Sequence, residues 1–130
     1  MNRMPDFMQA LGFSIERTDE HEAVLRMDVP DVLMSPFGTV HGGAIAALFD
    51  TGLAVAIARH LDAADRIATH NLNVSYVTFA REQCLRCHAR VVSLRTAVAI
   101  AEGEVLTAAG GLVAKAVGTF GIRRRAPREA

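Results

Sequence analysis

The alternation of hydrophobic and polar positions divides the chain into short strands around one long apolar segment. From Gly42 to Ala58 nearly every residue is Ala, Leu, Ile, Val, Phe or Gly, and this length and composition favour a helix over a strand. A short helix is expected over 3–13, with Gly12 as its stop. Period-two patterns bounded by Pro, Gly and Asp predict strands over 14–19, 22–29, 69–77, two within 84–101 with a turn near 94–96, and 112–122.

These elements predict a single α+β domain spanning residues 1–130, with about five antiparallel strands and one long helix. Residues 123–130 are expected to form a polar tail. The helix is apolar on nearly every side, because Asp50 and Thr51 are its only polar residues. A helix covered by one sheet alone would show a polar outer face. We therefore expect a second copy of the chain to cover the side that the sheet leaves open.

The charge balance and residue usage exclude several classes of protein. Fourteen Lys and Arg residues match fourteen Asp and Glu residues, and the chain has no Trp and one Tyr. It therefore lacks the basic excess and the stacking aromatic residues of a nucleic-acid binder. The apolar segment is short for a membrane span and contains a carboxylate, and the N-terminus lacks the apolar run of a signal peptide. We expect a cytoplasmic protein that binds neither nucleic acid nor membrane.

Two cysteines are too few for a disulfide scaffold. Cys84 and Cys87 have the spacing of half a zinc site, but residues three apart on a strand point to opposite faces, and the sequence has no second pair. The spacing predicts two ordinary strand residues and no metal site.

Asp50 lies at the centre of the apolar helix and is the most informative residue of the chain. A carboxylate held there loses hydration, which makes it a better base at neutral pH. Buried lone carboxylates are rare unless they are paired or used in chemistry. Two other interpretations stay open: Asp50 caps a second helix after a break near Gly52, or it faces a gap filled with solvent.

His41, Gly42 and Gly43 lie where the loop becomes the helix. Glycines let a ligand approach the backbone closely, and the first N–H groups of a helix are unpaired and carry a partial positive charge. Such groups can hold the oxyanion of an acyl-transfer reaction, although a tight turn that needs glycine is the alternative. His41 and Asp50 are nine residues apart, about 13 Å along the axis and half a turn out of phase. A shared substrate would need Asp50 from a neighbouring subunit.

The segment from Gly38 to Thr51 resembles the HGG…D signature of hotdog-fold thioesterases of the phenylacetyl-CoA thioesterase type, within the hydroxybenzoyl-CoA thioesterase superfamily. Residues 69–76 also resemble that family's strand after the helix, and the order of elements matches over nearly the whole chain. The resemblance implies a hotdog fold, in which an antiparallel sheet of about five to six strands wraps around the central helix. It also implies a homodimer or homotetramer with active sites at the dimer interface.

The resemblance assigns roles to residues by their place in the motif. The amide of Gly42 polarises the thioester carbonyl, and Asp50 of the neighbouring chain acts as general base or as nucleophile. Thr69 positions the water or the carboxylate, and His41 orders the loop. Relatives carry Asn at the position of Ser35, and the shorter hydroxyl side chain changes how the attacking water would be held.

Together these features predict an acyl-CoA thioesterase that releases a carboxylic acid and free CoA, without a cofactor, since CoA is part of the substrate. Gly43 and Arg81 are further candidates for contacts with CoA, Arg81 through the phosphates. Two other functions stay open: a hotdog protein that binds acyl-CoA without hydrolysing it, as a sensor or carrier, and a dehydratase of hydroxyacyl thioesters. The dehydratase would need a pair of a His and an acid that the sequence does not offer. The sequence does not determine the acyl group.

Overall fold

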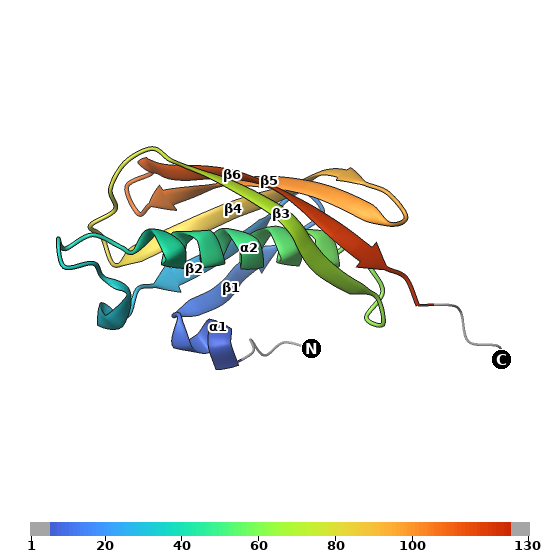
Figure 1. The fold of residues 1–130 in the computed structure, drawn as a ribbon, viewed down its shortest axis with the longest axis horizontal. Coiled ribbons are helices and arrows are strands. Elements are labelled where there is room, and N and C mark those ends of the chain that lie inside the picture. Colours follow the sequence, from blue (N-terminus) through green and yellow to red (C-terminus); the bar gives the residue numbers. More distant parts are fainter. Residues whose placement is uncertain (1–5, 126–130) are drawn as a thin grey trace.

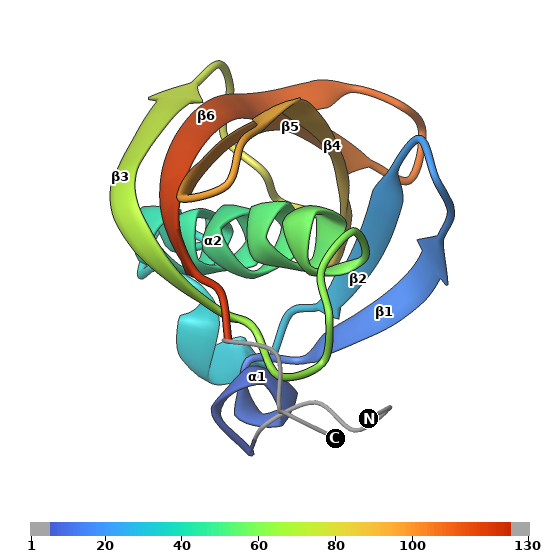
Figure 2. The ribbon, with the colours of Figure 1, turned by 90° about the vertical axis from the view of Figure 1, so that its right-hand side faces the viewer.

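A curved antiparallel sheet wraps around one long helix (Figure 1 and Figure 2). The computed structural model describes residues 6–125. In chain order the elements are α1 (Asp6–Ala10), β1 (Phe13–Thr18), β2 (Ala23–Asp28), the 3-10 turn η1 (Asp31–Leu33), α2 (Gly42–Ala58), β3 (Arg66–Tyr76), β4 (Cys84–Leu94), β5 (Val98–Thr107) and β6 (Leu112–Arg123).

The six strands lie in the order β1-β2-β4-β5-β6-β3, and every neighbouring pair is antiparallel. β1 and β3 are therefore the two edges of the sheet, and each has one side that pairs with no strand within residues 6–125. In Figure 2 the strands arch over α2, and α1 lies on the open side between the two edges. The edge position of β3 leaves a strand of eleven residues available for pairing.

The hydrophobic core lies between α2 and the inner face of the sheet. Alternate residues of β4 and β5 point inward and are buried, which matches the period-two pattern of these strands. Small inward side chains let the helix lie close to the sheet: a Cβ added to Gly52 would lie 2.8 Å from Sγ of Cys87. The largest fully buried side chains are Phe49, Phe120, Leu25, Met27, Leu48, Leu53, Ile57 and Leu85.

The predicted long helix is confirmed over Gly42–Ala58, and no helix within residues 6–125 has the length and hydropathy of a membrane span. The predicted helix over 3–13 is too long at its end, because Gly12 adopts a φ of +80° and Phe13 already belongs to β1. The first three residues of that prediction lie outside the described residues.

Two strands are longer than the sequence pattern predicts. β3 begins at Arg66 rather than at residue 69, and β5 continues to Thr107. The reason for the early start of β3 is its pairing with β6, which runs from Arg66 opposite Arg123 to Tyr76 opposite Ala114. Backbone pairing with a neighbour therefore extends these strands past the region where their side chains alternate.

The described part of the predicted polar tail, residues 123–125, is held against the rest of the fold. Arg123 is the last residue of β6, and the backbone N–H of Arg125 donates to Asp65 at 3.1 Å. The guanidinium of Arg124 donates to the carbonyl of Thr96 at 3.1 Å. Residues 126–130 lie outside the described residues.

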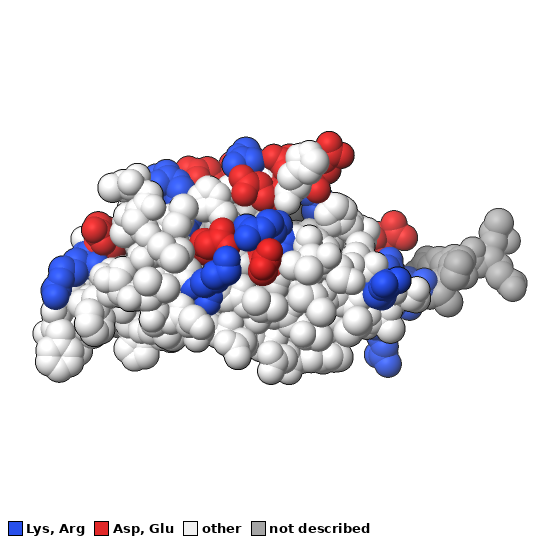
Figure 3. All heavy atoms as spheres, turned by 90° about the horizontal axis from the view of Figure 1, so that it is seen from above, with Lys and Arg blue, Asp and Glu red and all other residues white. Residues whose placement is uncertain are grey.

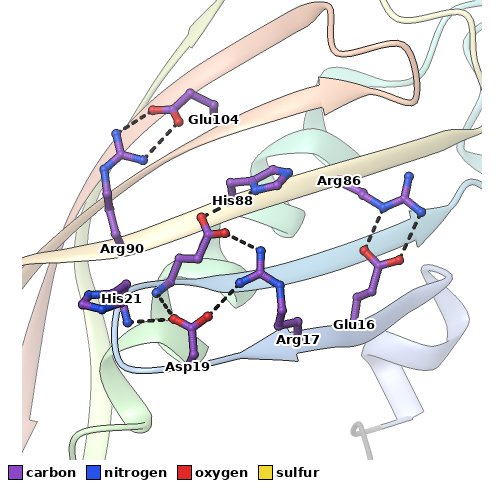
Figure 4. Close-up of polar contacts among 9 residues, drawn as sticks. Glu16, Arg17, Asp19, His21, Arg86, His88, Arg90 and Glu104 are labelled. Carbon is purple, nitrogen blue, oxygen red and sulfur yellow. Dashed lines mark hydrogen bonds and ion pairs between the residues drawn. The ribbon is translucent and has the colours of Figure 1, made fainter.

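The outer face of the sheet carries a band of interleaved positive and negative side chains (Figure 3). Arg86 on β4 reaches across β2 to Glu16 on β1, with N–O distances of 2.7 and 3.0 Å. Arg90 binds Glu104 on β5 in the same two-pronged way, at 2.9 and 3.1 Å (Figure 4). The charges of this face are therefore paired with one another.

Candidate functional site

The start of α2 leaves one backbone donor free. His41 is the N-cap residue: its Nδ1 accepts a hydrogen bond from the N–H of Gly43 at 2.9 Å, and its carbonyl accepts one from Ala44 at 3.0 Å. The N–H of Gly42, the first residue of the helix, has no acceptor within residues 6–125. The helix dipole places partial positive charge at this position, so the free amide is suited to hold a carbonyl oxygen or an oxyanion.

A cavity of about 550 Å³ lies beside this amide. It is formed by the loop before α2, the first turn of the helix, and the end of β3 with the segment that follows it. Its wall is largely apolar, with a few hydroxyl groups and the imidazole of His41. The lining residues are Ser35, Phe37, Thr39, Val40, His41, Gly42, Gly43, Ile45, Tyr76, Val77, Thr78, Phe79 and Ala80. An apolar group of a ligand can therefore lie next to the free N–H of Gly42.

Tyr76 connects the end of β3 to the start of α2. Its hydroxyl donates to the carbonyl of Gly42 at 2.6 Å. Desolvation raises the pKa of the Tyr76 phenol, which favours the protonated form that donates this bond. Sequence reasoning missed Tyr76 as a site residue, because it fits the alternation of its strand, on the same face as Leu72 and Val74.

A second polar contact lies two turns further along the helix. Oγ1 of Thr69 on β3 donates to Oδ1 of Asp50 on α2 at 2.6 Å. The structure thus brings together two of the residues that the resemblance singled out, and β3 provides the partner. The hydroxyl fixes the orientation of the carboxylate through one oxygen.

The prediction that Asp50 is buried is wrong for the single chain, in which the residue is half-buried. Its neighbours on the same face of α2, Ala46, Ala47 and Ala54, are half-buried too. The physical reason is that the sheet covers the other faces of the helix and leaves this one uncovered. α2 is continuous through Asp50, so the alternative of a helix break near Gly52 is wrong as well.

Asp50 and Gly42 do not meet within one chain. Eight residues separate them on a continuous helix, which corresponds to about 12 Å along its axis. The carboxylate of one chain therefore cannot act on a carbonyl held by the Gly42 amide of the same chain.

The other predicted site residues are engaged in local contacts. The hydroxyl of Ser35 shares a hydrogen bond of 2.8 Å with that of Thr39 and accepts one from the N–H of Phe37, so it closes the loop before α2. The N–H of Gly43 is taken by His41. Arg81 is exposed in the segment after β3, next to the lining of the cavity.

Cys84 and Cys87 lie on β4 as free cysteines. Burial raises the pKa of Cys87 to about 12, so this residue is a protonated thiol in the core and not a nucleophile. Within residues 6–125 no group of three or more His, Cys, Asp or Glu side chains could hold a metal ion.

Comparison with known proteins identifies the family. The sequence model of the thioesterase superfamily matches residues 37–114, which is more than half of the chain and includes α2 and β3. The chain belongs to the thioesterase superfamily. Its hotdog fold, with six antiparallel strands around one main helix, confirms the fold that the sequence resemblance implies.

Relatives of this thioesterase-superfamily chain agree with that assignment. A protein of Halobacterium salinarum described as a candidate esterase is 39% identical over 104 residues, covering 76% of this chain and 68% of the relative. A crystal structure from Ralstonia eutropha JMP134, described as a candidate thioesterase related to phenylacetic acid degradation, is 28% identical with a TM-score of 0.86. The match covers 92% of this chain and 91% of the Ralstonia eutropha chain.

A crystal structure of a Bacillus halodurans protein with CoA is 29% identical to this chain, with a TM-score of 0.80. The match covers 93% of this chain and 81% of the Bacillus halodurans chain. The family match and the esterase relative together place this chain among hydrolases of the thioesterase type.

Proposed function

We propose that this chain hydrolyses acyl-CoA thioesters to a carboxylic acid and free CoA, at sites shared between two copies of the chain. The observation that carries the proposal is the unpaired N–H of Gly42 at the start of α2, beside the apolar cavity. A thioester carbonyl bound there points its oxygen at the positive end of the helix. As the tetrahedral transition state forms, negative charge develops on this oxygen, and the preorganised N–H stabilises it.

Asp50 supplies the second half of the chemistry. As general base, its carboxylate takes a proton from water while the water oxygen attacks the carbonyl carbon; the C–S bond then breaks and CoA leaves as a thiolate that becomes protonated. As nucleophile, the carboxylate attacks the carbonyl carbon, the C–S bond breaks and CoA leaves as a thiolate that becomes protonated, and water then hydrolyses the mixed anhydride that has formed. In both routes the hydrogen bond from Thr69 holds one carboxylate oxygen and leaves the other free to react.

The topology supports a site shared between subunits. β3 runs antiparallel to α2, since Tyr76 at its end contacts Gly42, while Thr69 near its beginning contacts Asp50. The free edge of β3 can pair with the β3 of a second copy about a two-fold axis. Antiparallel pairing near the middle of the strand puts the early part of one β3 opposite the end of the other. Asp50 of one copy then lies beside Gly42 of the other.

The same pairing would cover the face of α2 that the single chain leaves open. Asp50 and three alanines line that face, and small side chains permit close approach of a second helix. We therefore propose a homodimer, which can pair further into a homotetramer, as the active form.

CoA as the leaving group is supported by the relatives rather than by a contact in the chain. The Bacillus halodurans neighbour was solved with CoA, and the Ralstonia eutropha neighbour is named for phenylacetic acid degradation. Arg81 remains the candidate for contact with a phosphate. Gly43 can contact CoA only through its carbonyl or Cα, because its N–H already binds His41. The proposed reaction needs no cofactor besides the substrate.

The free amide can be deleted without rebuilding the helix. Gly42 is the first helical residue, a position that proline favours, and His41 before it has φ −59° and ψ 132°, as a residue before proline requires. Gly42→Pro therefore removes the N–H and keeps the helix start. Gly42→Ala is the matched control, because its Cβ would lie at ordinary contact distance, 3.4 Å, from the Tyr76 ring.

The measurement is thiol release from a panel of aryl and aliphatic acyl-CoAs. We expect Gly42→Pro to lower kcat about 10²–10³-fold relative to Gly42→Ala. Asp50→Asn should lower it about 10²–10⁴-fold, while Asp62→Asn, a carboxylate in the exposed loop after α2, should have no effect. Equal rates for Asp50→Asn and the wild type would refute the role given to Asp50. No release by the wild type on any substrate, together with saturable binding of acyl-CoA, would favour the non-catalytic binder.

Co-expression of two inactive variants tests the shared site. In a mixed dimer of Gly42→Pro and Asp50→Asn, one site carries both defects and the other carries none. Random pairing should restore about a quarter of wild-type activity. Absence of any recovery, with mixed dimers verified by mass spectrometry, would contradict a site built from two chains.

A further inference from the structure

A continuous run of hydrogen bonds connects β3 to the imidazole at the start of α2. The hydroxyl of Tyr76 donates to the carbonyl of Gly42 at 2.6 Å. The N–H of Gly43 donates to Nδ1 of His41 at 2.9 Å. The Gly42 carbonyl and the Gly43 N–H belong to one peptide group, so the two bonds lie on opposite ends of the same dipole.

This arrangement determines which nitrogen of His41 carries the proton. A backbone N–H can only donate, so Nδ1 must accept and has no hydrogen. The neutral imidazole then carries its hydrogen on Nε2. His41 is exposed and lines the cavity, so Nε2–H is a donor available to a bound ligand.

The bond from Tyr76 strengthens this arrangement. A hydrogen bond to a peptide carbonyl polarises the whole peptide group and makes its N–H a better donor, by about 10–30% per bond. The Tyr76 ring also lies against Gly42: Cζ, Cε1 and the hydroxyl oxygen would each be 3.4–3.5 Å from a Cβ at this position. The ring thus limits how far the peptide between Gly42 and Gly43 can rotate.

The end of β3 is itself anchored, so it can hold the helix start in place. The backbone N–H of Val77, directly after Tyr76, donates to the carbonyl of Val113 on β6 at 2.8 Å. Tyr76 is therefore attached to the sheet on one side and to the first turn of α2 on the other.

We propose that Tyr76 is a positioning residue: by fixing the peptide between Gly42 and Gly43 it keeps His41 in the tautomer that presents Nε2–H to the cavity, and it holds Gly42, whose own N–H is free, in place at the first turn of α2. This inference rests on the proposed thioesterase function for its effect on rate, and on the hydrogen bonds alone for its effect on His41. A bound thioester would then meet two fixed donors, the Gly42 amide and the imidazole.

The test compares Tyr76→Phe with Ser75→Ala. Tyr76→Phe removes only the hydroxyl and keeps the ring against Gly42. Ser75→Ala removes a hydroxyl from the neighbouring residue of β3, which points to the opposite face of the sheet and is exposed. Tyr76→Phe should lower kcat about 2- to 10-fold with KM nearly unchanged, as expected for one neutral hydrogen bond. Ser75→Ala should match the wild type in kcat and KM.

Nitrogen-15 NMR of the unliganded protein provides a readout that does not depend on activity. In the wild type, the imidazole of His41 should show Nδ1 without a proton and Nε2 with one. In Tyr76→Phe the Gly43 amide signal should shift and the two His41 nitrogens should move toward a mixture of tautomers, whereas Ser75→Ala should leave both unchanged.

Unchanged Gly43 and His41 signals in a folded Tyr76→Phe protein would overturn the inference, as would an unchanged kcat in an active enzyme. If the wild type hydrolyses no thioester, the proposed function fails, and the NMR comparison still decides whether Tyr76 controls His41.

Discussion

The polar side chains on the two faces of the sheet have different partners. On the outer face, charged residues form pairs with one another, such as Arg90 with Glu104, and both partners are partly exposed to water. On the inner face, two side chains of β3 donate hydrogen bonds to α2: Thr69 to the carboxylate of Asp50, and Tyr76 to the carbonyl of Gly42. Exposed ion pairs contribute roughly 0–1 kcal/mol each, because water already solvates their charges.

The difference shows where function can be expected in this fold. The outer ion pairs, such as Arg86 with Glu16 and Arg90 with Glu104, satisfy one another's charges. Inside, each contact satisfies one atom and leaves another available: the second oxygen of Asp50 and the N–H of Gly42. Polar atoms that lack a hydrogen-bond partner therefore identify the candidate site better than the number of charged side chains on a face does.

The largest effect on stability should come from the inner apolar packing. Leu53 on α2 is fully buried and contacts the Gly118 region of β6. Leu53→Ala should lower the free energy of unfolding by about 2–5 kcal/mol, because it leaves a cavity between helix and sheet. Leu112→Ala, at a position that is 38% exposed, is the matched control and should cost clearly less. Urea denaturation at equal protein concentrations measures both, and equal costs would contradict the packing described for α2.

The inner polar contact should matter for rate more than for stability. Thr69→Val keeps the size of the side chain and removes the hydrogen bond to Asp50. Since hydrogen bonds to charged groups are worth about 1.5–3 kcal/mol, kcat should fall about 10- to 100-fold. Thr69→Ser restores the hydroxyl and should recover most of the rate. Equal loss in both variants would show that the methyl group, not the hydroxyl, is what the site requires.

The close approach of α2 to β4 can be tested through Gly52. A methyl group there would lie 2.8 Å from Sγ of Cys87, so Gly52→Ala must push the helix or the strand aside. We expect a loss of about 1–3 kcal/mol of unfolding free energy, reduced by the better helix propensity of alanine. In the double variant with Cys87→Ala the loss should shrink by about 1 kcal/mol. Strictly additive effects would contradict the contact.

The smallest effect should come from the outer face. Hydrogen bonds from Arg90, assisted by Lys115, hold the pKa of Glu104 below its ordinary value. A carboxyl whose pKa is lower in the folded state stabilises the fold above its ordinary pKa, about 4.3, and loses that contribution as the pH falls through the folded value. Glu104→Gln should therefore cost less than about 1 kcal/mol at pH 7.

This difference between Glu104→Gln and the wild type should shrink toward pH 3, and urea titrations at both pH values measure it. The control Glu20→Gln, at a side chain that is 79% exposed, should show no difference at either pH. A cost for Glu104→Gln that grows with acid would contradict the sign of the shift. Neither variant should change the rate of thioester hydrolysis.

Much of the fold could be predicted from local patterns. The apolar pattern predicts the long helix to within about two residues of its observed end, because an apolar stretch of this length, with only Asp50 and Thr51 polar, has few other stable conformations. The patterns also predict where the strands lie along the chain, although they were counted as about five and the sheet has six. The strand ends differ from the prediction, since pairing with a neighbour extends β3 to Arg66 and β5 to Thr107. Their order within the sheet, with β3 beside β6 at the edge, also depends on contacts between distant segments.

The candidate site was only partly visible in the sequence. Asp50, Gly42 and His41 stand out because polar residues and glycines interrupt an apolar pattern. Tyr76 fits the pattern of its strand, so nothing local marks it. Asp50 is half-buried in the single chain and not buried as the apolar helix predicts. The composition of a helix does not tell which of its faces the sheet will cover.

By itself the sequence determined which segments are helix and strand and which residues interrupt their patterns, because these properties follow from neighbours a few positions apart. Only the tertiary structure decided that Thr69 meets Asp50, that Tyr76 meets Gly42, and that the first amide of α2 stays unpaired beside a cavity. Those contacts join residues 19 and 34 positions apart, and they form only because the sheet curves around the helix and brings β3 alongside it.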